Sequence, residues 1–157
     1  TNYKKNNIKD MQEIHFLVAK KKTRSDNTWL IMEEMVLKKR GFLVKIQKKD
    51  TTIGYSFFSI NEHSSSLFSS CIFRENFIIY KNLNHKAIIK GLEYLKSKNC
   101  KNFFTGTTKT LYSSNKDSSE EDLNKNKNLE KFRSAFGGTE SKYIIFNDIP
   151  EEINHIL

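Results

Sequence analysis

Two short groups of residues have the types and spacing that suit phosphate binding. Asn84 and His85 stand at the start of a segment with helical periodicity. A helix start offers unpaired N–H groups and the positive end of a dipole. An aromatic, strand-like segment follows this helix and ends at Thr105, Gly106 and Thr107, whose backbone groups suit the same ligand. The pattern predicts a phosphate-binding helix–strand unit; the alternative is an ordinary helix–strand unit that packs on a sheet and binds nothing.

The helix is predicted over Asn84–Lys96, because its apolar residues recur every three or four positions and lysines occupy the other side. The Asn84 side chain is predicted to cap the first turn, since its oxygen can accept from a free backbone N–H group. Asn99 is predicted to end the helix in the left-handed conformation. A strand, Cys100–Thr105, is expected to follow.

A second candidate element lies near the C-terminal end. A short helix is predicted over Leu129–Phe136, with its apolar residues on one side, and Gly137 and Gly138 follow it. The two glycines allow a sharp turn and a close approach of the backbone to a ligand. Arg133 lies within this helix, where it is either a solvated side chain or a contact to negative charge.

Composition limits the classes of protein. The 157 residues, 37% of them hydrophobic, suffice for one domain with a single core. The net charge is +9, but the lysines are scattered, so general solubility is the simplest explanation and an anionic ligand such as a nucleotide is the alternative. No apolar run is long enough to cross a bilayer. Cys71 and Cys100 lie in predicted strands without metal-ligand spacing, which predicts reduced core residues, no metal site and a cytoplasmic protein.

The chain alternates between predicted helices and strands. A first helix starts near Ile8 and ends at Lys20–Lys22, and a second starts with Asp26 as its N-cap and ends at Gly41. Three antiparallel strands follow, and the strand after the long helix is expected beside the third of them. The predicted sheet strands are Leu43–Gln47, Ile53–Ile60, Leu67–Phe73, Cys100–Thr105 and, last, Tyr143–Phe146.

One segment departs from this alternation. Ser113–Asn128 is almost entirely polar and has little to bury, so it is predicted to be a weakly ordered surface insertion in a single domain over residues 1–157. The first residue is Thr1 rather than Met, so a fragment of a longer protein is an open alternative. The predicted order is two helices, three antiparallel strands, a helix, a strand, a short helix and a strand. This order predicts a mixed, mostly antiparallel α/β sheet with helices on both faces.

Three stretches resemble the FemAB-like branch of the GNAT acyltransferase superfamily, which acts on cell-envelope precursors. HFLVAKKKTRSDNTW, from His15 to Trp29, is similar to the family's His, basic run and Thr-Arg-Ser before a Trp-bearing helix. Asn84–Gly106 is similar to its long helix and a strand that ends in an aromatic residue, one further residue and Gly. The stretch from Phe132 to Gly138, FRSAFGG, looks like its Phe-Lys-x-x-aromatic-Gly-Gly element, with Arg133 in place of Lys.

The resemblance implies a single GNAT lobe whose donor binds beside splayed central strands, with its phosphates at the start of the Asn84–Lys96 helix. The implied donor is acetyl-CoA or another acyl-CoA, with aminoacyl-tRNA as the alternative, and no metal takes part. Tyr80–His85 lacks the glycines of the pyrophosphate loop found in acetyl-CoA enzymes. The expected ligand cleft has three walls. They are the helix start at Asn84 and His85, the strand end at Thr105, Gly106 and Thr107, and the later element with Arg133, Gly137 and Gly138.

In acyl transfer of this kind, an amine attacks a thioester or ester carbonyl directly. Arg133 is the candidate for stabilising negative charge on the transition state or a phosphate, and a solvated helix Arg is the alternative. Tyr112 is a candidate proton donor to the leaving group, or else a packing residue. Glu62 and His63 share a hairpin turn, where solvation is the simpler interpretation, and Glu62 is the candidate general base. Cys71 and Cys100 lack a basic neighbour in the sequence and are not expected to be nucleophiles.

Three functions compete. The favoured one is an N-acyltransferase of the GNAT type that modifies an amine on a small-molecule or nucleotide-linked cell-envelope or sugar precursor. The second is a catalytically silent GNAT lobe that binds a nucleotide ligand or a partner. The third is tRNA binding, which the net charge and the aminoacyl-tRNA donors of some relatives support. Because many FemAB-like proteins contain two lobes, a second GNAT lobe or a homodimer is an expected partner, and no membrane span is expected.

Overall fold

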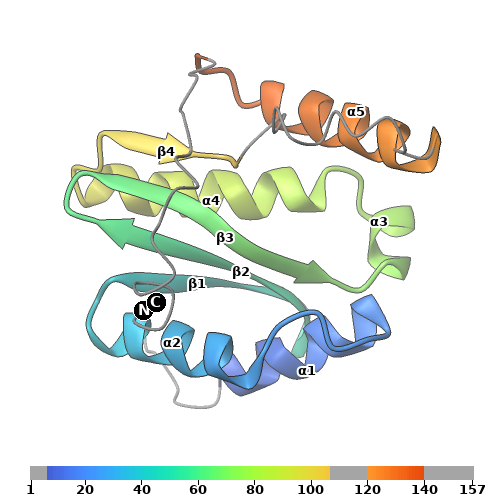
Figure 1. The fold of residues 1–157 in the computed structure, drawn as a ribbon, viewed down its shortest axis with the longest axis horizontal. Helices are drawn as coiled ribbons and strands as arrows, with labels where there is room; N and C mark the ends of the chain where they lie inside the picture. Colours follow the sequence, from blue (N-terminus) through green and yellow to red (C-terminus); the bar gives the residue numbers. More distant parts are fainter. Residues whose placement is uncertain (1–6, 107–119, 140–157) are drawn as a thin grey trace, which may run out of the picture. The chain divides into compact units, whose positions relative to one another are not determined.

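The computed structural model describes residues 7–106 and 120–139. The chain divides into two compact units, Thr1–Gly106 and Thr107–Leu157, and each is described by itself. In the first unit, a sheet lies between helices on its two faces (Figure 1). The described part of the second unit contains the helix α5 (Glu120–Ser134) and the residues that follow it.

The sheet of the first unit has four strands: β1 (Gly41–Lys48), β2 (Thr51–Asn61), β3 (Ser64–Ile72) and β4 (Asn102–Phe104), in that order. The first three pair antiparallel, and β4 pairs with β3 in parallel. Tight hairpin turns suit antiparallel neighbours, whereas a parallel neighbour requires a crossover connection. This arrangement confirms the mixed, mostly antiparallel sheet predicted from the sequence, including the position of the fourth strand beside the third.

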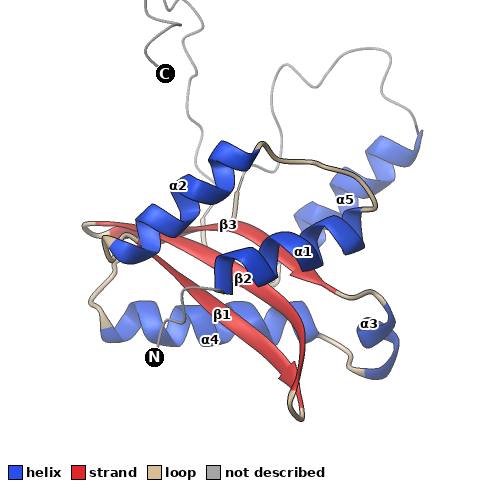
Figure 2. Ribbon diagram, turned by 90° about the horizontal axis from the view of Figure 1, so that it is seen from below, coloured by secondary structure: helices blue, strands red, loops and turns tan. Residues whose placement is uncertain are grey.

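Helices cover both faces of this sheet (Figure 2). The two N-terminal helices, α1 (Asn7–Ala19) and α2 (Asp26–Leu37), lie on one face, and α4 (Leu83–Ser97) lies on the other. A short helix, α3 (Glu75–Ile79), precedes α4 and was not predicted. Its five residues are too few to show a helical period in the sequence.

The core under α1 and α2 is built on alternate residues of β2. Tyr55 and Phe57 are completely buried, and they meet Met11 of α1 and Met32 of α2, which are also completely buried. Because alternate strand residues point to the same face, this pair fixes which side of β2 the two helices cover. Trp29 completes this layer at the start of α2.

The opposite core is aromatic and brings α4 close to the sheet. The ring of Phe58 stacks on that of Phe42 with centroids 4.9 Å apart, and Tyr94 of α4 lies 4.5 Å from Phe42. Gly91 of α4 lies against the Phe58 ring, so closely that a Cβ at this position would collide with it. Gly91 is therefore required for the close approach of helix and strand.

Two helix starts differ from the sequence prediction. Ser25, not Asp26, is the N-cap of α2, and its Oγ accepts from the Thr28 N–H at 3.3 Å. Asn82, not Asn84, is the N-cap of α4, and it has a left-handed φ of 63° and no side-chain capping bond. Two asparagines at similar positions have the same capping ability, so only the backbone conformation distinguishes them. The left-handed stop at Asn99 is confirmed, with φ 57°.

The second unit also differs in where its helix starts. α5 begins at Glu120, within the segment predicted as a polar insertion and well before the predicted start at Leu129. The rings of Phe132 and Phe136 make an edge contact with centroids 5.4 Å apart. Gly137 and Gly138 follow with φ values of 70° and 102°, the left-handed region that favours glycine. The predicted strand Tyr143–Phe146 and the first residues of the predicted insertion lie outside the described residues.

Candidate functional site

An opening at one edge of β3 is the first element of the site. β4 pairs with only three residues of β3, Ser64–Ser66, while β3 continues to Ile72. Within the described residues, the rest of this edge therefore has no partner strand. At a sheet edge without a partner strand, backbone N–H and C=O groups can pair with an extended ligand.

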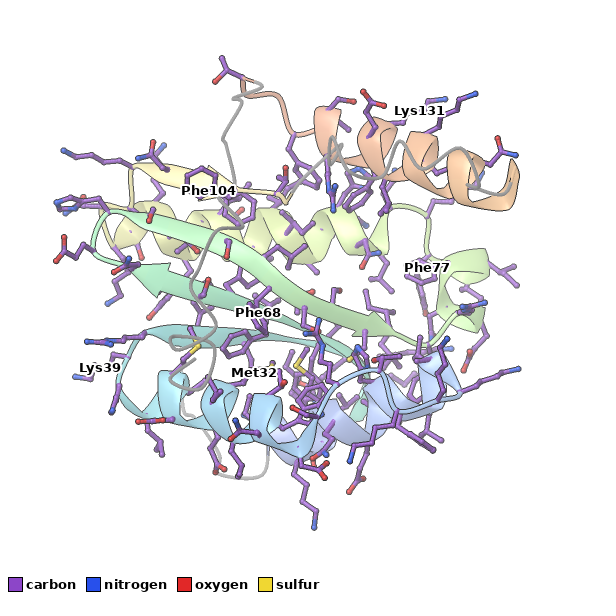
Figure 3. All side chains as sticks on the ribbon, in the orientation of Figure 1. Met32, Lys39, Phe68, Phe77, Phe104 and Lys131 are labelled. Carbon is purple, nitrogen blue, oxygen red and sulfur yellow. The ribbon has the colours of Figure 1, made fainter. Side chains whose placement is uncertain are left out.

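A β-bulge lies where the two strands separate. Phe57 of β2 is opposite Ser69, and Phe58 is opposite Leu67, so Phe68 is an extra residue of β3. A bulge increases the local twist and changes the direction of the strand. Phe68 lies on the face that α1 and α2 cover, where its ring meets that of Phe57 at 6.0 Å (Figure 3). The bulge gives a physical reason for the early end of the β3–β4 pairing.

The start of α4 lies beside the same part of β3. The Ser70 hydroxyl donates to the Asn84 Oδ1 at 3.4 Å, which connects the strand just after the bulge to the first turn of the helix. Asn82 makes no side-chain cap, so no side chain of the N-cap residue satisfies the first-turn N–H groups. His85, in the same turn, is half-buried and has an interaction of its own. The structure thus brings Asn84 and His85 to the opening of the sheet.

The end of β4 reaches the opening from the other side. Since β4 runs parallel to β3 and Phe104 is opposite Ser66, Thr105 and Gly106 leave the sheet close to the level of the bulge. Gly106 has a φ of 104°, which favours glycine. Thr107 and Tyr112 lie outside the described residues, and their roles stay predictions.

The remaining predicted site residues are placed elsewhere in the chain. Glu62 is exposed on the β2–β3 turn, where six strand positions separate it from the bulge, roughly 20 Å along an extended strand. Arg133 is half-buried in the last turn of α5, and Gly137 and Gly138 follow that helix in the second unit. The site roles of these four residues stay predictions.

Sequence reasoning assigned no role to Arg24, which lies in the connection between α1 and α2. Its Nη2 donates to the Phe68 carbonyl oxygen at 3.3 Å, and its guanidinium carbon lies 5.3 Å from the centroid of the Phe68 ring. Arg24 therefore joins the helical layer to the bulge. The one sequence signal was the Thr-Arg-Ser resemblance, because nothing local shows that Arg24 meets a strand 44 residues away.

Two buried polar atoms at this contact have no hydrogen-bond partner in the described part of the chain: Arg24 Nε and Ser69 Oγ. Ser69 directly follows the bulge residue Phe68 whose carbonyl accepts from Arg24. Buried polar groups are nearly always hydrogen-bonded, and those without a partner often mark a place where a ligand or water binds. Among the described residues, the contact between Arg24 and the bulge is therefore incompletely hydrogen-bonded, as it would be where a water or a ligand binds.

A cavity of about 570 Å³ adjoins Arg24. It is lined by α1, by the connection to α2 and by the start of α2, and it includes His15, Arg24 and Trp29. The His15 ring makes an edge contact with that of Trp29 at 5.4 Å, and its Nδ1 lies 3.3 Å from the Thr23 hydroxyl oxygen. The volume is in the range of small-molecule sites.

The electrostatics of this cavity keep its histidine neutral. Burial lowers the pKa of His15 below its ordinary value of 6.5, and the nearby positive charge of Arg24 lowers this pKa further. A neutral imidazole has a free nitrogen that can accept a proton near pH 7. His15 is thus a candidate general base that sequence reasoning did not assign.

Other chemistries have less support. Burial raises the pKa of the Cys71 thiol to about 11, and its sulfur lies 3.6 Å from the Met11 carbonyl oxygen, so it is not a reactive thiolate at neutral pH. Cys100 is a free, half-buried residue that precedes β4 rather than lying mid-strand as predicted. Among the described residues, no group of three His, Cys, Asp or Glu side chains is placed to bind a metal ion. No helix in residues 7–106 and 120–139 is long and apolar enough to span a bilayer.

Comparison with known proteins identifies the architecture. Neither protein-family models nor curated protein sequences match the chain. Solved structures do, among them AAC(6')-Iy in complex with the bisubstrate analogue CoA-S-monomethyl-acetylneamine, with a TM-score of 0.62 and 15% identity over 92% of each chain. The chain has the GNAT fold.

Two further structures support the same conclusion. The aminoglycoside acetyltransferase meta-AAC0020 from an uncultured soil metagenomic sample, in complex with sisomicin, has a TM-score of 0.63 and 11% identity over 95% of this chain and 93% of that one. A ribosomal-protein-alanine N-acetyltransferase from Brucella melitensis has a TM-score of 0.59 and 8% identity over 92% of this chain and 96% of that one. These structures share the GNAT superfamily with the sequence resemblance but do not single out its FemAB-like branch.

Proposed function

We propose that this protein is an N-acyltransferase that transfers an acyl group, such as acetyl, from an acyl-CoA to an amine. The observation that carries the proposal is the opening between β3 and β4, with a bulge at Phe68 and the uncapped start of α4 beside it. The shared fold supports it, because the solved GNAT structures include N-acetyltransferases, and one was solved with a CoA-containing analogue. A fold alone does not determine a function, so the residues of the site must also suit the chemistry.

The described residues suit an acyl-CoA. The exposed backbone of β3 after Ser66 can pair with an extended, amide-containing chain, and the first turn of α4 can bind phosphate through its N–H groups. The sequence lacks the glycines of a pyrophosphate loop, but Asn82 adopts the left-handed backbone that such a turn needs. Lys81 and Lys86 are exposed on either side of the helix start and add positive charge there.

The acceptor amine is proposed to bind in the cavity beside Arg24. In the reaction, the amine nitrogen forms a bond to the thioester carbonyl carbon, and the carbon–sulfur bond breaks. His15 accepts the proton that the attacking amine loses, and the leaving thiolate is protonated by water or by the predicted donor Tyr112. Arg24 positions the connection against the bulge through the Phe68 carbonyl.

The predicted roles of Tyr112 and Arg133 are compatible with this proposal, the first as a proton donor to the leaving thiolate and the second as a contact to a phosphate. A cell-envelope or sugar precursor as the acceptor, and aminoacyl-tRNA as the donor, also remain proposals that rest on the FemAB-like resemblance.

The proposal is tested by titrating acetyl-CoA into the protein in a calorimeter and by following the release of free thiol with amine acceptors. Ser70→Trp places a large ring at the opening, and Ser97→Trp places the same ring at the far end of α4 as the control. We expect Ser70→Trp to weaken acetyl-CoA binding by about tenfold or more, since each factor of ten is about 1.4 kcal/mol, and Ser97→Trp to bind normally.

The outcomes separate the alternatives. Equal binding by both variants would show that the donor does not use this opening. Acetyl-CoA binding without turnover for any amine would support a silent GNAT lobe. An unaltered protein that does not bind acetyl-CoA would overturn the proposed function.

A further inference from the structure

The charges around the cavity are unequal. Four cationic residues line it, Lys9, Lys21, Lys22 and Arg24, against two acidic ones, Glu13 and Asp26. Lys22 and Asp26 form an ion pair with each other at 2.7 Å, so they nearly cancel. The remaining charged side chains, Lys9, Lys21, Arg24 and Glu13, carry two more positive charges than negative ones.

Arg24 contributes the positive charge that is least compensated. Its neighbours are the Phe68 carbonyl and ring, which do not neutralise a guanidinium. Among the described residues, none of the ion pairs includes Arg24, and its Nε is buried without a hydrogen-bond partner. A partly buried guanidinium without a carboxylate is a strong site for a ligand anion, because its fork of N–H groups matches carboxylate and phosphate oxygens.

The pKa of His15 reflects the same positive charge. Burial lowers this pKa, and the charge of Arg24 lowers it further, which is the effect expected where positive charge disfavours a second cation. An acceptor with several ammonium groups would meet this repulsion throughout the cavity. An acceptor with one anionic group would gain an attraction at Arg24 and Lys21 instead.

We propose that the amine acceptor of this protein carries an anionic group, a carboxylate or a phosphate, which binds Arg24 and Lys21 while its amine faces His15. This inference rests on the proposed function, because it names the acceptor of the same acyl transfer. It also separates this protein from the aminoglycoside acetyltransferases of the same fold: an aminoglycoside is a polycation at neutral pH and does not suit this cavity. A volume of about 570 Å³ suits an amino acid, a short peptide end or an amino sugar.

The experiment compares matched amines with acetyl-CoA as the donor. Glycine is paired with glycinamide to test a carboxylate, glucosamine 6-phosphate is paired with glucosamine to test a phosphate, and kanamycin represents a polycation. Turnover is followed by thiol release, and binding of each amine to the CoA-bound protein is measured by calorimetry, so that the preference can also be measured where turnover is slow. Because paired amines differ in basicity, the decisive quantity is how each preference changes on substitution.

Lys21→Gln removes one charge at an exposed residue of the cavity, and Lys45→Gln removes one from an exposed position of β1 outside it. We expect at least one anionic amine to be preferred over its neutral partner and over kanamycin. Lys21→Gln should reduce that preference by about tenfold, the size of one lost contact to a charged group, and Lys45→Gln should leave it unchanged. If Lys21→Gln lowers the preference in only one of the two pairs of amines, that pair identifies the anion as a carboxylate or a phosphate.

Two results would overturn the inference while the proposed function stands: equal or better use of kanamycin or the neutral amines, or an anion preference that Lys21→Gln does not change. Failure to bind acetyl-CoA would instead overturn the proposed function, and this inference with it. Circular dichroism melting of each variant confirms that folding is unaltered, since exposed lysines contribute little to stability.

Discussion

The two edges of β3 have opposite characters. On one side, β3 pairs with β2 over nearly its whole length, and aromatic residues of β1, β2 and α4 pack closely behind that pairing. On the other side, β4 pairs over three residues, and within the described residues the edge is then open, beside a bulge, an uncapped helix start and two polar atoms without partners. We expect most of the stability to come from the closed edge, and we propose that the donor binds at the open one. The bulge at Phe68 is the boundary between them.

The largest expected effect is a loss of stability at the closed edge. Phe58→Ala removes a completely buried ring that stacks on Phe42 and rests against Gly91, so we expect the free energy of unfolding to fall by about 3–5 kcal/mol. Denaturant unfolding measures this change. Phe104→Ala is the matched control, because Phe104 lies in β4 and is 55% exposed, and its loss should be below about 1 kcal/mol. Similar losses in the two variants would contradict the assignment of the closed edge as the stable core.

The next effect is on catalysis in the cavity beside Arg24. If His15 is the general base, His15→Gln should lower kcat/KM for acyl transfer by about 100-fold or more with little change in melting temperature. The imidazole must be neutral to accept a proton, so kcat/KM of the unaltered enzyme should show a rise below pH 6.5 that His15→Gln lacks, because burial and Arg24 lower the pKa of His15. His63→Gln, on the exposed β2–β3 turn, is the control and should behave as the unaltered enzyme. A pH profile that is the same in His15→Gln and the unaltered enzyme would exclude His15 as the base.

A smaller effect tests the turn before α4. Asn82 has a left-handed φ of 63°, so Asn82→Ala should reduce stability by about 1 kcal/mol, whereas Asn82→Gly should be neutral within a few tenths. Thermal melting in the absence of ligands measures both. If the turn also presents phosphate-binding N–H groups, Asn82→Ala should weaken CoA binding and Asn82→Gly should not. A stabilising Asn82→Ala would show that the turn is not left-handed in solution.

The smallest expected effect is on the pKa of His15, and it tests whether the charge of Arg24 acts in the cavity. Arg24→Gln removes a positive charge near His15, so the pKa of His15 should rise towards its ordinary value, while Arg24→Lys should keep it low. A titration of the His15 ring by NMR follows the change directly. An unchanged pKa in Arg24→Gln would leave burial as its sole cause and would weaken the electrostatic description of the cavity.

The sequence predicted the closed edge well and the open edge only in part. The short turns between the first three strands and the helical period of α4 are local patterns, so the strand order followed from them. The site needs long-range information: the bulge depends on how β3 aligns with β2, and the role of Arg24 depends on a contact to Phe68. His15 was similarly hidden, because a helical histidine gains its altered pKa from residues that fold around it.

The start of α5 shows a different limit. Residues Glu120 to Asn128 carry few apolar side chains, so no hydrophobic period marks the helix that the structure shows there. The predicted cap at Asn84 failed for a related reason, since the choice between two asparagines was made by a left-handed backbone that composition does not reveal.

The connection between α1 and α2 has a consequence for how this fold diversifies. Lys20–Ser25 takes part in no strand pairing, begins at a left-handed Lys20 and ends at the Ser25 cap, yet it supplies many of the residues around the cavity. If the acceptor binds in this cavity as proposed, substitutions at Lys21, Lys22 and Thr23 would alter acceptor choice, whereas Arg24 also contacts β3 through Phe68. Under that proposal, selection could exchange one substrate for another here while the scaffold is inherited unchanged, and the same segment would be a place to graft a new specificity by design.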